Sequence, residues 1–348
     1  MTRYLITGGC GFIGSNFIRH LLAEEPDAQV VNIDALTYAG NLENVRDLEG
    51  EARYRFVYGD IRRATTVRAY MREAEVVVNF AAETHVDRSI MDAGDFVKTD
   101  VYGTFVLLNE ATRLPAGQLR RFLHISTDEV YGEARPGTSF CESDPLRPRS
   151  PYSASKAAAE MMCLAFRETY GLPVVVSRAS NTFGPYQHPE KALPLFITNA
   201  LDGQPLPVYG DGRQVRDWLF IEDHCRALRL LLERGEPGEA YNVASGNERT
   251  NVEVAYAVLD LLEKPRTLVR FVEDRAGHDR RYSLDTGKLR TLGWSPCVRW
   301  DDALAATVRW YREHRAWWER IKRDPRFQQY YRRQYAARLE RSRGNPPP

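Results

Sequence analysis

The chain has 348 residues, of which 43% are hydrophobic and 27% charged, and its formal net charge is +1 at pH 7. This composition is typical of one large or two ordinary globular domains and excludes a disordered chain. Because the net charge is close to zero, we expect no nucleic-acid partner and no attraction to a membrane surface. We find no apolar run of membrane-spanning length and no signal-peptide pattern. The five scattered cysteines form no Cys-x-x-Cys pair, which argues against a disulfide framework and favours the cytoplasm.

In the first half of the chain, short apolar runs alternate with longer amphipathic stretches. We predict buried strands at residues 4–6, 30–33, 55–57, 76–80, 122–125 and 174–176. Helices in most of the gaps would give repeated βαβ units. The sequence therefore predicts an α/β fold with a doubly wound parallel sheet of the Rossmann type.

After about residue 178, proline and glycine become frequent and the elements become shorter. We predict a smaller, interleaved C-terminal domain for the substrate, made of residues 179–215 and about 241–320. Residues 1–178 and about 216–240 would form the Rossmann domain. Within it, residues 216–234 would return to the sheet as a strand and a helix.

A glycine pattern follows the first predicted strand, with Gly8, Gly11 and Gly14 spaced Gly-x-x-Gly-x-x-Gly before an amphipathic helix. Glycine lets the backbone turn tightly and approach a pyrophosphate, which then lies at the helix N-terminus. Asp34 ends the second strand, where its carboxylate can bind the hydroxyls of an adenosine ribose. The same charge repels a 2′-phosphate, so the sequence predicts NAD rather than NADP.

Tyr152 and Lys156 lie four residues apart on a predicted helix that Ser150 and Pro151 begin and Gly171 ends. At this spacing they share one helix face. A free tyrosine has a pKa of about 10, so it acts as a base near neutral pH only beside positive charge. We therefore predict Tyr152 as a catalytic base, assisted by Lys156 and a nicotinamide ring.

An adjacent pair of carboxylates, Asp128 and Glu129, follows Thr127 at the end of the fifth predicted strand, where such sheets bind ligands. Neighbouring side chains near a strand end point in different directions and can hold different protonation states. One carboxyl can then donate a proton while the other accepts one.

Together these motifs resemble the extended short-chain dehydrogenase/reductase family. The run Ser-Thr-Asp-Glu-Val-Tyr-Gly at 126–132 resembles its nucleotide-sugar branch, the dTDP-glucose 4,6-dehydratases. Further stretches similar to that branch are residues 37–42, 81–89, 184–191, 209–218 and 274–279. The resemblance spans roughly residues 1–320. It implies a homodimeric lyase that converts dTDP-glucose to dTDP-4-keto-6-deoxyglucose by C4 oxidation, loss of water across C5 and C6, and C6 reduction with a recycled NAD.

The resemblance also assigns site residues. The catalytic group is Thr127, Asp128, Glu129, Tyr152 and Lys156. The last two also contact NAD, together with Gly8, Gly11, Phe12, Ile13, Gly14, Asp34, Ala35, Leu36, Thr37, Asp60, Ile61, Phe80, Ala81, Ala82, Glu83, Thr84 and Thr99. The substrate would be held by Thr84, Thr127, Asn181, Lys191, Ala192, Pro207, Val208, Tyr209, Arg216, Asn251, Asp274, Arg275 and His278.

Several alternatives stay open from the sequence. The substrate base could be uridine, and the same fold serves nucleotide-sugar epimerases and decarboxylases. Asp128 and Glu129 argue against an epimerase, and Asp128 argues against most decarboxylases. A protein that only senses NAD would leave the Tyr152 and Lys156 pair unexplained. His85 could be a general base, but we prefer a loop histidine satisfied by a backbone carbonyl. No residue cluster has metal-ligand spacing, so we predict no metal.

A basic and aromatic tail covers residues 321–348, after an amphipathic helix predicted over about 301–318. Beyond Pro325, aromatic and leucine side chains recur every four residues between arginines, at Phe327, Tyr331, Tyr335 and Leu339. Such a stripe could bind RNA, a membrane surface or a partner subunit. We prefer a helix packed on its own protein. Because no motif residue lies there, removal of residues 326–348 is expected to leave catalysis intact.

Overall fold

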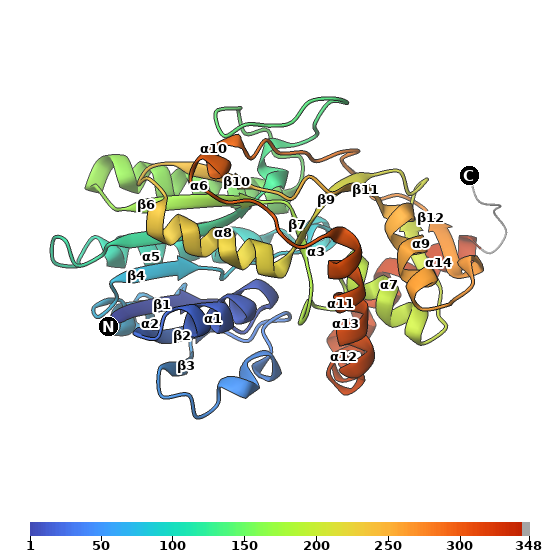
Figure 1. The fold of residues 1–348 in the computed structure, drawn as a ribbon, viewed down its shortest axis with the longest axis horizontal. Helices are drawn as coiled ribbons and strands as arrows, with labels where there is room; N and C mark the ends of the chain where they lie inside the picture. The colour runs from blue at the N-terminus through green and yellow to red at the C-terminus, as the bar shows by residue number, and fades with distance from the viewer. Residues whose placement is uncertain (343–348) are drawn as a thin grey trace.

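The computed structural model describes residues 1–342. Its main element is a seven-stranded sheet, seen on the left of Figure 1. In pairing order the strands are β10 (Ala240–Val243), β6 (Val174–Ala179), β5 (Arg121–Thr127), β4 (Val76–Asn79), β1 (Thr2–Thr7), β2 (Ala28–Asp34) and β3 (Tyr54–Tyr58). All neighbours are parallel. The order of β3, β2, β1, β4, β5 and β6 is that of the Rossmann fold, which confirms the predicted fold class.

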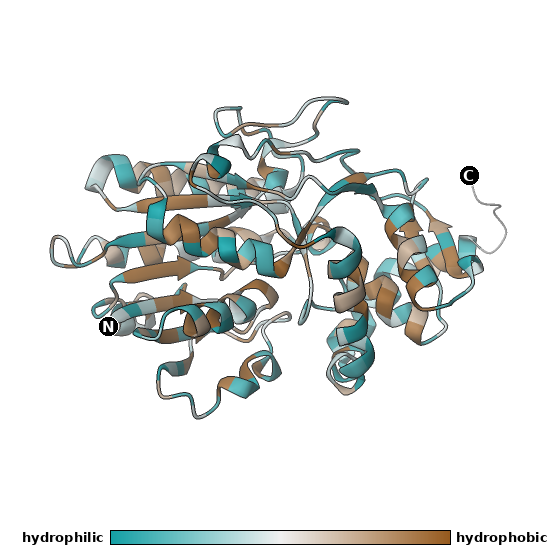
Figure 2. Ribbon diagram, in the orientation of Figure 1, coloured by the Kyte–Doolittle hydropathy of each residue, from teal (hydrophilic) through white to brown (hydrophobic). Residues whose placement is uncertain are grey.

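Helices cover both faces of this sheet, and the sequence of β4 shows why. Val76 and Val78 belong to one hydrophobic core and Val77 to the other, because successive side chains of a strand point to opposite faces. The strands therefore appear as continuous apolar bands between helices in Figure 2. Side chains of α1 (Phe12–Glu24) and α8 (Ile221–Arg234) join the first core, which continues into the second region of the molecule. Those joining the second are α2 (Ala64–Met71), α5 (Thr104–Ala111) and α6 (Pro151–Tyr170).

A second region, on the right of Figure 1, holds two small sheets. The first sheet contains, in pairing order, β11 (Glu248–Thr250), β9 (Val215–Phe220) and β7 (Asn181–Phe183). The second pairs β12 (Val269–Val272) with β8 (Leu206–Tyr209). The helical elements of this region are α7 (Ala192–Leu201), α9 (Asn251–Leu261) and the short η4 (Arg266–Leu268).

The strand that returns to the main sheet is not the predicted one. Residues 215–220 form β9, which pairs with β11 and β7, whereas β10 joins the main sheet beside β6. A polar pair in β9, Arg216 and Asp217, gives the physical reason, since Asp217 accepts hydrogen bonds from Ser245 and from the backbone of Gly246 beside β11. The helix α8 does pack on the sheet as predicted, and β10 follows it as the next βαβ strand.

The remaining short elements connect these layers. They are η1 (Leu42–Leu48), α3 (Val86–Met91), α4 (Gly94–Phe96), η2 (Val97–Gly103), η3 (Asp128–Tyr131) and α10 (Gly287–Thr291). The single helix predicted over 301–318 is instead two helices, α11 (Trp300–Glu313) and α12 (Arg315–Arg323). The break lies at His314, whose ring stacks on Trp310 and whose Nδ1 lies 2.9 Å from the Trp310 carbonyl, in competition with the helical backbone.

The tail folds back on the protein as α13 (Pro325–Tyr331), η5 (Arg332–Ala336) and α14 (Ala337–Ser342). Phe327, Tyr330 and Tyr335 are buried, which confirms the self-packed interpretation of the stripe. The predicted tail continues to residue 348, and its last six residues lie outside the described part. Among helices within residues 1–342, none combines the length and apolarity needed to cross a bilayer.

Candidate active site

The turn between β1 and α1 lines a large pocket at the carboxyl edge of the sheet, which we call the sheet-edge pocket. Gly8 has a φ of +70°, and a Cβ there would lie 2.6 Å from the Ala81 nitrogen. A Cβ on Gly14 would lie 2.6 Å from the Gly8 carbonyl oxygen. The side-chain-free cap at Gly11 leaves the first-turn N–H groups of α1 available to an anion. The residues present therefore fit a dinucleotide pyrophosphate.

Almost all residues predicted to contact the cofactor line this pocket. They are Gly8, Gly11, Phe12, Ile13, Gly14, Asp34, Ala35, Thr37, Asp60, Ile61, Phe80, Ala81, Ala82, Glu83, Thr84, Thr99, Tyr152 and Lys156. Leu36 does not line it, so its contact with the cofactor stays a prediction. Leu36 has a φ of 50°, and its N–H donates to Asp34 Oδ1 at 2.8 Å, so it shapes the turn through its backbone.

The Asp34 carboxylate is held by two backbone donors at the end of β2. Cys10 N–H donates to Oδ2 at 2.9 Å, and Leu36 N–H donates to Oδ1 at 2.8 Å. Burial raises the pKa of Asp34, and these two hydrogen bonds oppose that rise. Each oxygen keeps a lone pair for a further donor, as recognition of ribose hydroxyls requires.

Tyr152 and Lys156 lie near the start of α6, which opens with a capping box formed by Ser150 and Ser153. Lys156 Nζ donates to the Ile125 carbonyl at 2.6 Å, and burial lowers the pKa of Lys156. Burial and then the charge of Glu129 hold the pKa of Tyr152 well above 10. The surrounding protein groups thus favour the phenol form of Tyr152, and a positive charge is needed beside it to make a base.

The two adjacent carboxyls lie on η3, directly after β5. Thr127 Oγ1 accepts from the Glu129 N–H at 3.3 Å and donates to Asp128 Oδ1 at 3.1 Å. Burial and the charge of Glu129 raise the pKa of Asp128 to about 8, so this acid is protonated at neutral pH. Burial also raises the pKa of Glu129, but Arg275 is the first of several cations that oppose the rise. Their surroundings therefore differ, with Asp128 suited to donate a proton and Glu129 to accept one.

A second pocket adjoins the first, and we call it the basic pocket. The residues that line both are Thr84, Glu129, Asn181, Glu190 and Lys191. The predicted substrate residues that line the basic pocket are Thr84, Asn181, Lys191, Ala192, Pro207, Val208, Tyr209, Arg216, Asn251, Arg275 and His278. The structure thus brings together most of the residues that the sequence assigned to the substrate.

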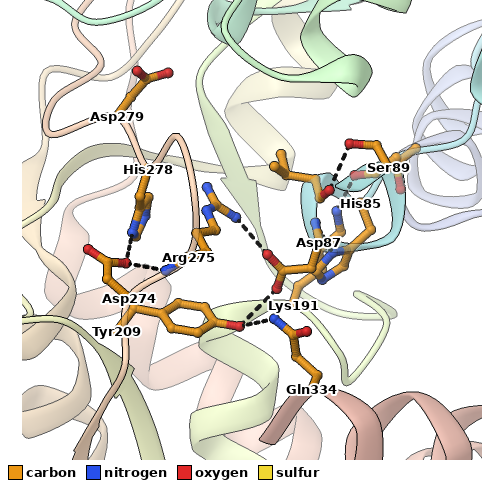
Figure 3. Close-up of polar contacts among 12 residues, drawn as sticks. His85, Asp87, Ser89, Lys191, Tyr209, Asp274, Arg275, His278, Asp279 and Gln334 are labelled. Atoms are coloured by element: carbon orange, nitrogen blue, oxygen red, sulfur yellow. Dashed lines mark hydrogen bonds and ion pairs between the residues drawn. The ribbon is translucent and has the colours of Figure 1, made fainter. Parts of the chain in front are cut away.

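Two predicted substrate residues lie elsewhere. Thr127 lines the sheet-edge pocket, beside the catalytic group. Asp274 lines neither pocket, so its contact with the substrate stays a prediction. Its Oδ1 lies 2.6 Å from His278 Nδ1, and its Oδ2 accepts from Gln214, so it orients His278 (Figure 3). Burial, reinforced by the charge of Arg275, lowers the pKa of His278 to about 4, so the ring is neutral and donates this hydrogen bond.

Three cationic side chains, Lys191, Arg216 and Arg275, line the basic pocket, together with the carboxylates of Asp87, Glu129 and Glu190. Arg216, which is 5% exposed, donates to the carbonyls of Val215 and Asp279, and no carboxylate in residues 1–342 forms an ion pair with it. Arg275 is only partly compensated, by an ion pair with Asp87 at 3.3 Å. Guanidinium groups match phosphate oxygens in a bidentate manner. The pocket therefore suits a diphosphate.

His85 fits neither of its two predicted roles. It caps α3, where its Nδ1 accepts from the Asp87 N–H at 3.2 Å rather than donating to a carbonyl. Burial lowers the pKa of His85 to about 4, so the ring is neutral. It lines the basic pocket and not the sheet-edge pocket, so nothing places it beside the catalytic tyrosine. In the described chain, no group of three or more His, Cys, Asp or Glu side chains could hold a metal ion.

Some residues that line the basic pocket were not predicted from the sequence. Asp87 lies within a stretch recognised as a family motif, but its role appears only when its partners Tyr209 and Arg275 are seen. Leu195 and Phe196 of α7 line the basic pocket, yet in the sequence they read as ordinary core residues. Tyr335 also lines it, from the tail, which carried no recognised motif.

Comparisons with known proteins agree with this geometry. A family model described as GDP-mannose 4,6 dehydratase matches residues 5–307. A dTDP-glucose 4,6-dehydratase of Xanthomonas campestris pv. campestris (strain B100) is 50% identical over 336 residues, which cover 91% of this chain and 95% of the relative. The crystal structure of DesIV, a dTDP-glucose 4,6-dehydratase from Streptomyces venezuelae with NAD and TYD bound, has a TM-score of 0.89 at 50% identity, covering 92% of this chain and 100% of that one.

A less similar structure offers a contrast. UDP-glucuronic acid 4-epimerase from Bacillus cereus, in complex with UDP-glucuronic acid and NAD, has a TM-score of 0.84 but only 28% identity, over 90% of this chain and 99% of that one. The fold is therefore shared with epimerases, whereas high identity lies with the dehydratases. The chain belongs to the GDP-mannose 4,6 dehydratase family, together with the enzymes named dTDP-glucose 4,6-dehydratase.

Proposed function

We propose that this enzyme is an NAD-dependent hydro-lyase that converts dTDP-glucose to dTDP-4-keto-6-deoxyglucose. The observation that carries the proposal is the pair of buried Asp128 and half-buried Glu129, which line the sheet-edge pocket together with Tyr152. Glu129 also lines the basic pocket. An epimerase needs only a base at C4. A dehydratase also needs an acid and a base for the loss of water, and this pair supplies both.

The catalytic residues then divide the proton transfers. Tyr152 removes the proton of the C4 hydroxyl, which Thr127 orients from its place beside Asp128. Glu129 takes the C5 proton, which the new C4 ketone has made acidic. Asp128, protonated at neutral pH because its pKa is about 8, gives its proton to the departing C6 hydroxyl. NAD held by the sheet-edge pocket would supply the acceptor for the C4 hydride and the donor of that hydride to C6.

We further propose that the sheet-edge pocket binds NAD and the basic pocket binds the nucleotide diphosphate. The crowded glycine turn, the α1 N-terminus and the Asp34 carboxylate support the first assignment. The arginines and Lys191 support the second. In terms of domains, residues 1–178 with about 216–240 would serve the cofactor, and residues 179–215 with about 241–320 the substrate. The two sets meet at Glu129 and Lys191.

A cytoplasmic homodimer is the assembly that we propose. Three exposed apolar side chains, Val97 and Tyr102 of η2 and Met161 of α6, support it, because η2 and α6 pack side by side. A second copy would cover them. Sedimentation of the purified enzyme at micromolar concentration tests this assembly, and a monomer there would contradict it.

An isotope experiment tests the reaction itself. Substrate deuterated at C4 should give product with that deuterium at C6 of the same molecule, and reaction in heavy water should place solvent deuterium at C5. Mass spectrometry of product from mixed labelled and unlabelled dTDP-glucose distinguishes the cases. Deuterium that stays at C4 indicates an epimerase, and deuterium that crosses between molecules contradicts a closed hydride loop. A parallel reaction with UDP-glucose measures the preference for the base.

A further inference from the structure

The tail reaches the basic pocket, which the sequence did not predict. Tyr335 of η5 lines this pocket and is 4% exposed. Its ring lies over that of Tyr209, with centroids 5.9 Å apart and an interplanar angle of 28°. Tyr209 in turn meets His278 edge to face, at 5.9 Å and 85°. One aromatic row therefore runs from the tail to the loop that carries Arg275.

A row of hydrogen bonds runs beside these rings (Figure 3). Gln334 Nε2 donates to the Tyr209 hydroxyl, and that hydroxyl donates to Asp87 Oδ2 at 3.0 Å. Asp87 Oδ1 pairs with Arg275 Nη1 at 3.3 Å. These bonds link Gln334 through Tyr209 and Asp87 to Arg275, which lines the pocket. A change in the tail should therefore alter the position of Tyr209 and of Arg275.

The helical geometry of η5 explains how two consecutive tail residues point inward. Residues 332–336 form a turn of π-helix, in which each residue rotates less about the axis than in an α-helix. Gln334 and Tyr335, which are 5% and 4% exposed, can therefore both face the pocket side. Such turns are frequent at functional sites. A strict four-residue repeat would have buried Tyr331 rather than Tyr330, and the structure buries Tyr330 more deeply.

A second contact anchors the tail to the rest of the enzyme. The Arg88 guanidinium lies between two rings, 4.1 Å from the centroid of Tyr38 and 4.6 Å from that of Tyr330. The same guanidinium pairs with the buried carboxylate of Glu190 at 2.8 Å. Tyr38 and Glu190 both line the sheet-edge pocket. This sandwich fixes α13, and so positions η5 against the basic pocket.

From these contacts we infer that the tail forms part of the wall of the sugar-nucleotide site. There Tyr335 contacts the bound nucleotide, and Gln334 is a positioning residue for Tyr209. The inference rests on the proposed function, since it takes the basic pocket as the nucleotide site. It replaces the expectation that removal of residues 326–348 leaves catalysis intact. Aromatic surface beside Pro207, Val208 and Tyr209 gives a base a flat partner, while the arginines hold the phosphates.

The test measures dTDP binding by calorimetry on the full-length enzyme saturated with NAD. Tyr335→Ala should weaken dTDP binding about 10-fold or more, the scale of one lost base–aromatic contact, and Tyr335→Phe should restore it to within about threefold. Gln334→Ala should weaken it about 3- to 10-fold, the scale of one hydrogen bond. For Tyr335→Ala, the KM for dTDP-glucose should rise while kcat stays within about threefold, because the catalytic groups lie on η3 and α6. NAD affinity should not change.

Matched controls separate a pocket role from a packing role. Phe327→Ala removes an equally buried ring from the same tail, but Phe327 lines neither pocket, so dTDP affinity should stay near that of the wild type. Tyr335→Leu keeps apolar bulk if Tyr335→Ala folds poorly, and it should also weaken dTDP binding. Wild-type dTDP affinity in the Tyr335 variants that lack the ring, or an equal loss in Phe327→Ala, overturns the inference. A wild-type enzyme that binds neither dTDP nor dTDP-glucose contradicts the proposed function instead.

Discussion

The two pockets share a wall, but their lining residues come from different kinds of segments of the chain. The sheet-edge pocket is lined mostly by residues that follow successive strands β1 to β6, each within a few positions of a strand end. The basic pocket collects residues from Thr84 to Tyr335, contributed by loops, small sheets and the tail. A parallel sheet determines the first arrangement, because its strand ends meet along one edge. Tertiary packing determines the second, so that pocket depends on contacts distant in the chain.

The largest effect that we predict tests the chemistry at the sheet edge. Tyr152→Phe should lower turnover roughly 10²- to 10⁴-fold, because the base for the first step is lost. Absorbance of the reduced cofactor in a single turnover should not appear on the wild-type timescale. The dTDP affinity of the variant should be unchanged, since Tyr152 does not line the basic pocket. Cofactor reduction at the wild-type rate would show that another residue is the base.

The variant Asp128→Asn separates the loss of water across C5 and C6 from the C4 oxidation that precedes it. Cofactor reduction should persist, whereas keto-sugar formation should slow roughly 100-fold or more, because the acid for the C6 hydroxyl is lost. The pH dependence has a definite sign. The acid form of Asp128 is present below its pKa of about 8, so wild-type elimination should slow as the pH rises through that value. Asp128→Asn should lose this alkaline limb, and a variant that cannot reduce the cofactor at all would contradict the assigned roles.

Cofactor choice should respond to one carboxylate. The wild-type enzyme should use NAD at least about 10-fold better than NADP, because the Asp34 charge would repel the 2′-phosphate of a dinucleotide bound in the sheet-edge pocket. Asp34→Asn removes the charge but keeps the size, and it should reduce that preference several-fold. The ratio of kcat/KM for the two cofactors measures it. Equal use of both cofactors by the wild type would contradict the role of Asp34, and unchanged dTDP affinity serves as the control.

The smallest effect is expected at the far end of the tail. Arg341 pairs with Glu273 at 2.8 Å, but both side chains are more than half exposed, at 62% and 66%. Exposed ion pairs contribute less than about 1 kcal/mol to the free energy of unfolding. Arg341→Ala should therefore leave dTDP affinity within about twofold and hardly change thermal stability. A strong loss of affinity would mean that the pocket depends on α14 as well as on η5.

What the sequence could predict also differs between the sheet-edge pocket and the basic pocket. Gly8, Asp34, Asp128 and Tyr152 line one pocket, as expected, because each stands at a fixed distance from a strand or helix end, which apolar patterning reveals. Leu36 lies outside that lining, and its backbone N–H donates to Asp34, a contact that composition does not reveal.

Packing contacts explain the other departures. The pairing of β9 depends on Asp217 and its bonds beyond the strand, and the break at His314 depends on a ring stacked on Trp310. Asp274 was assigned to the substrate because the stretch 274–279 resembles a family motif. Only the folded structure shows that it faces His278.

The lining of the basic pocket by Tyr335 has a consequence for the order in which the enzyme is made. A ribosome delivers β1, α1 and the Asp34 loop first, so the cofactor site can form while most of the substrate region is still unmade. Tyr335 lies after β12 in the chain, so the part of the basic pocket that it lines is synthesised after all the strands. If Tyr335 contacts the nucleotide as inferred above, a nascent chain that has not yet reached η5 would bind a dinucleotide but hold the sugar nucleotide only weakly.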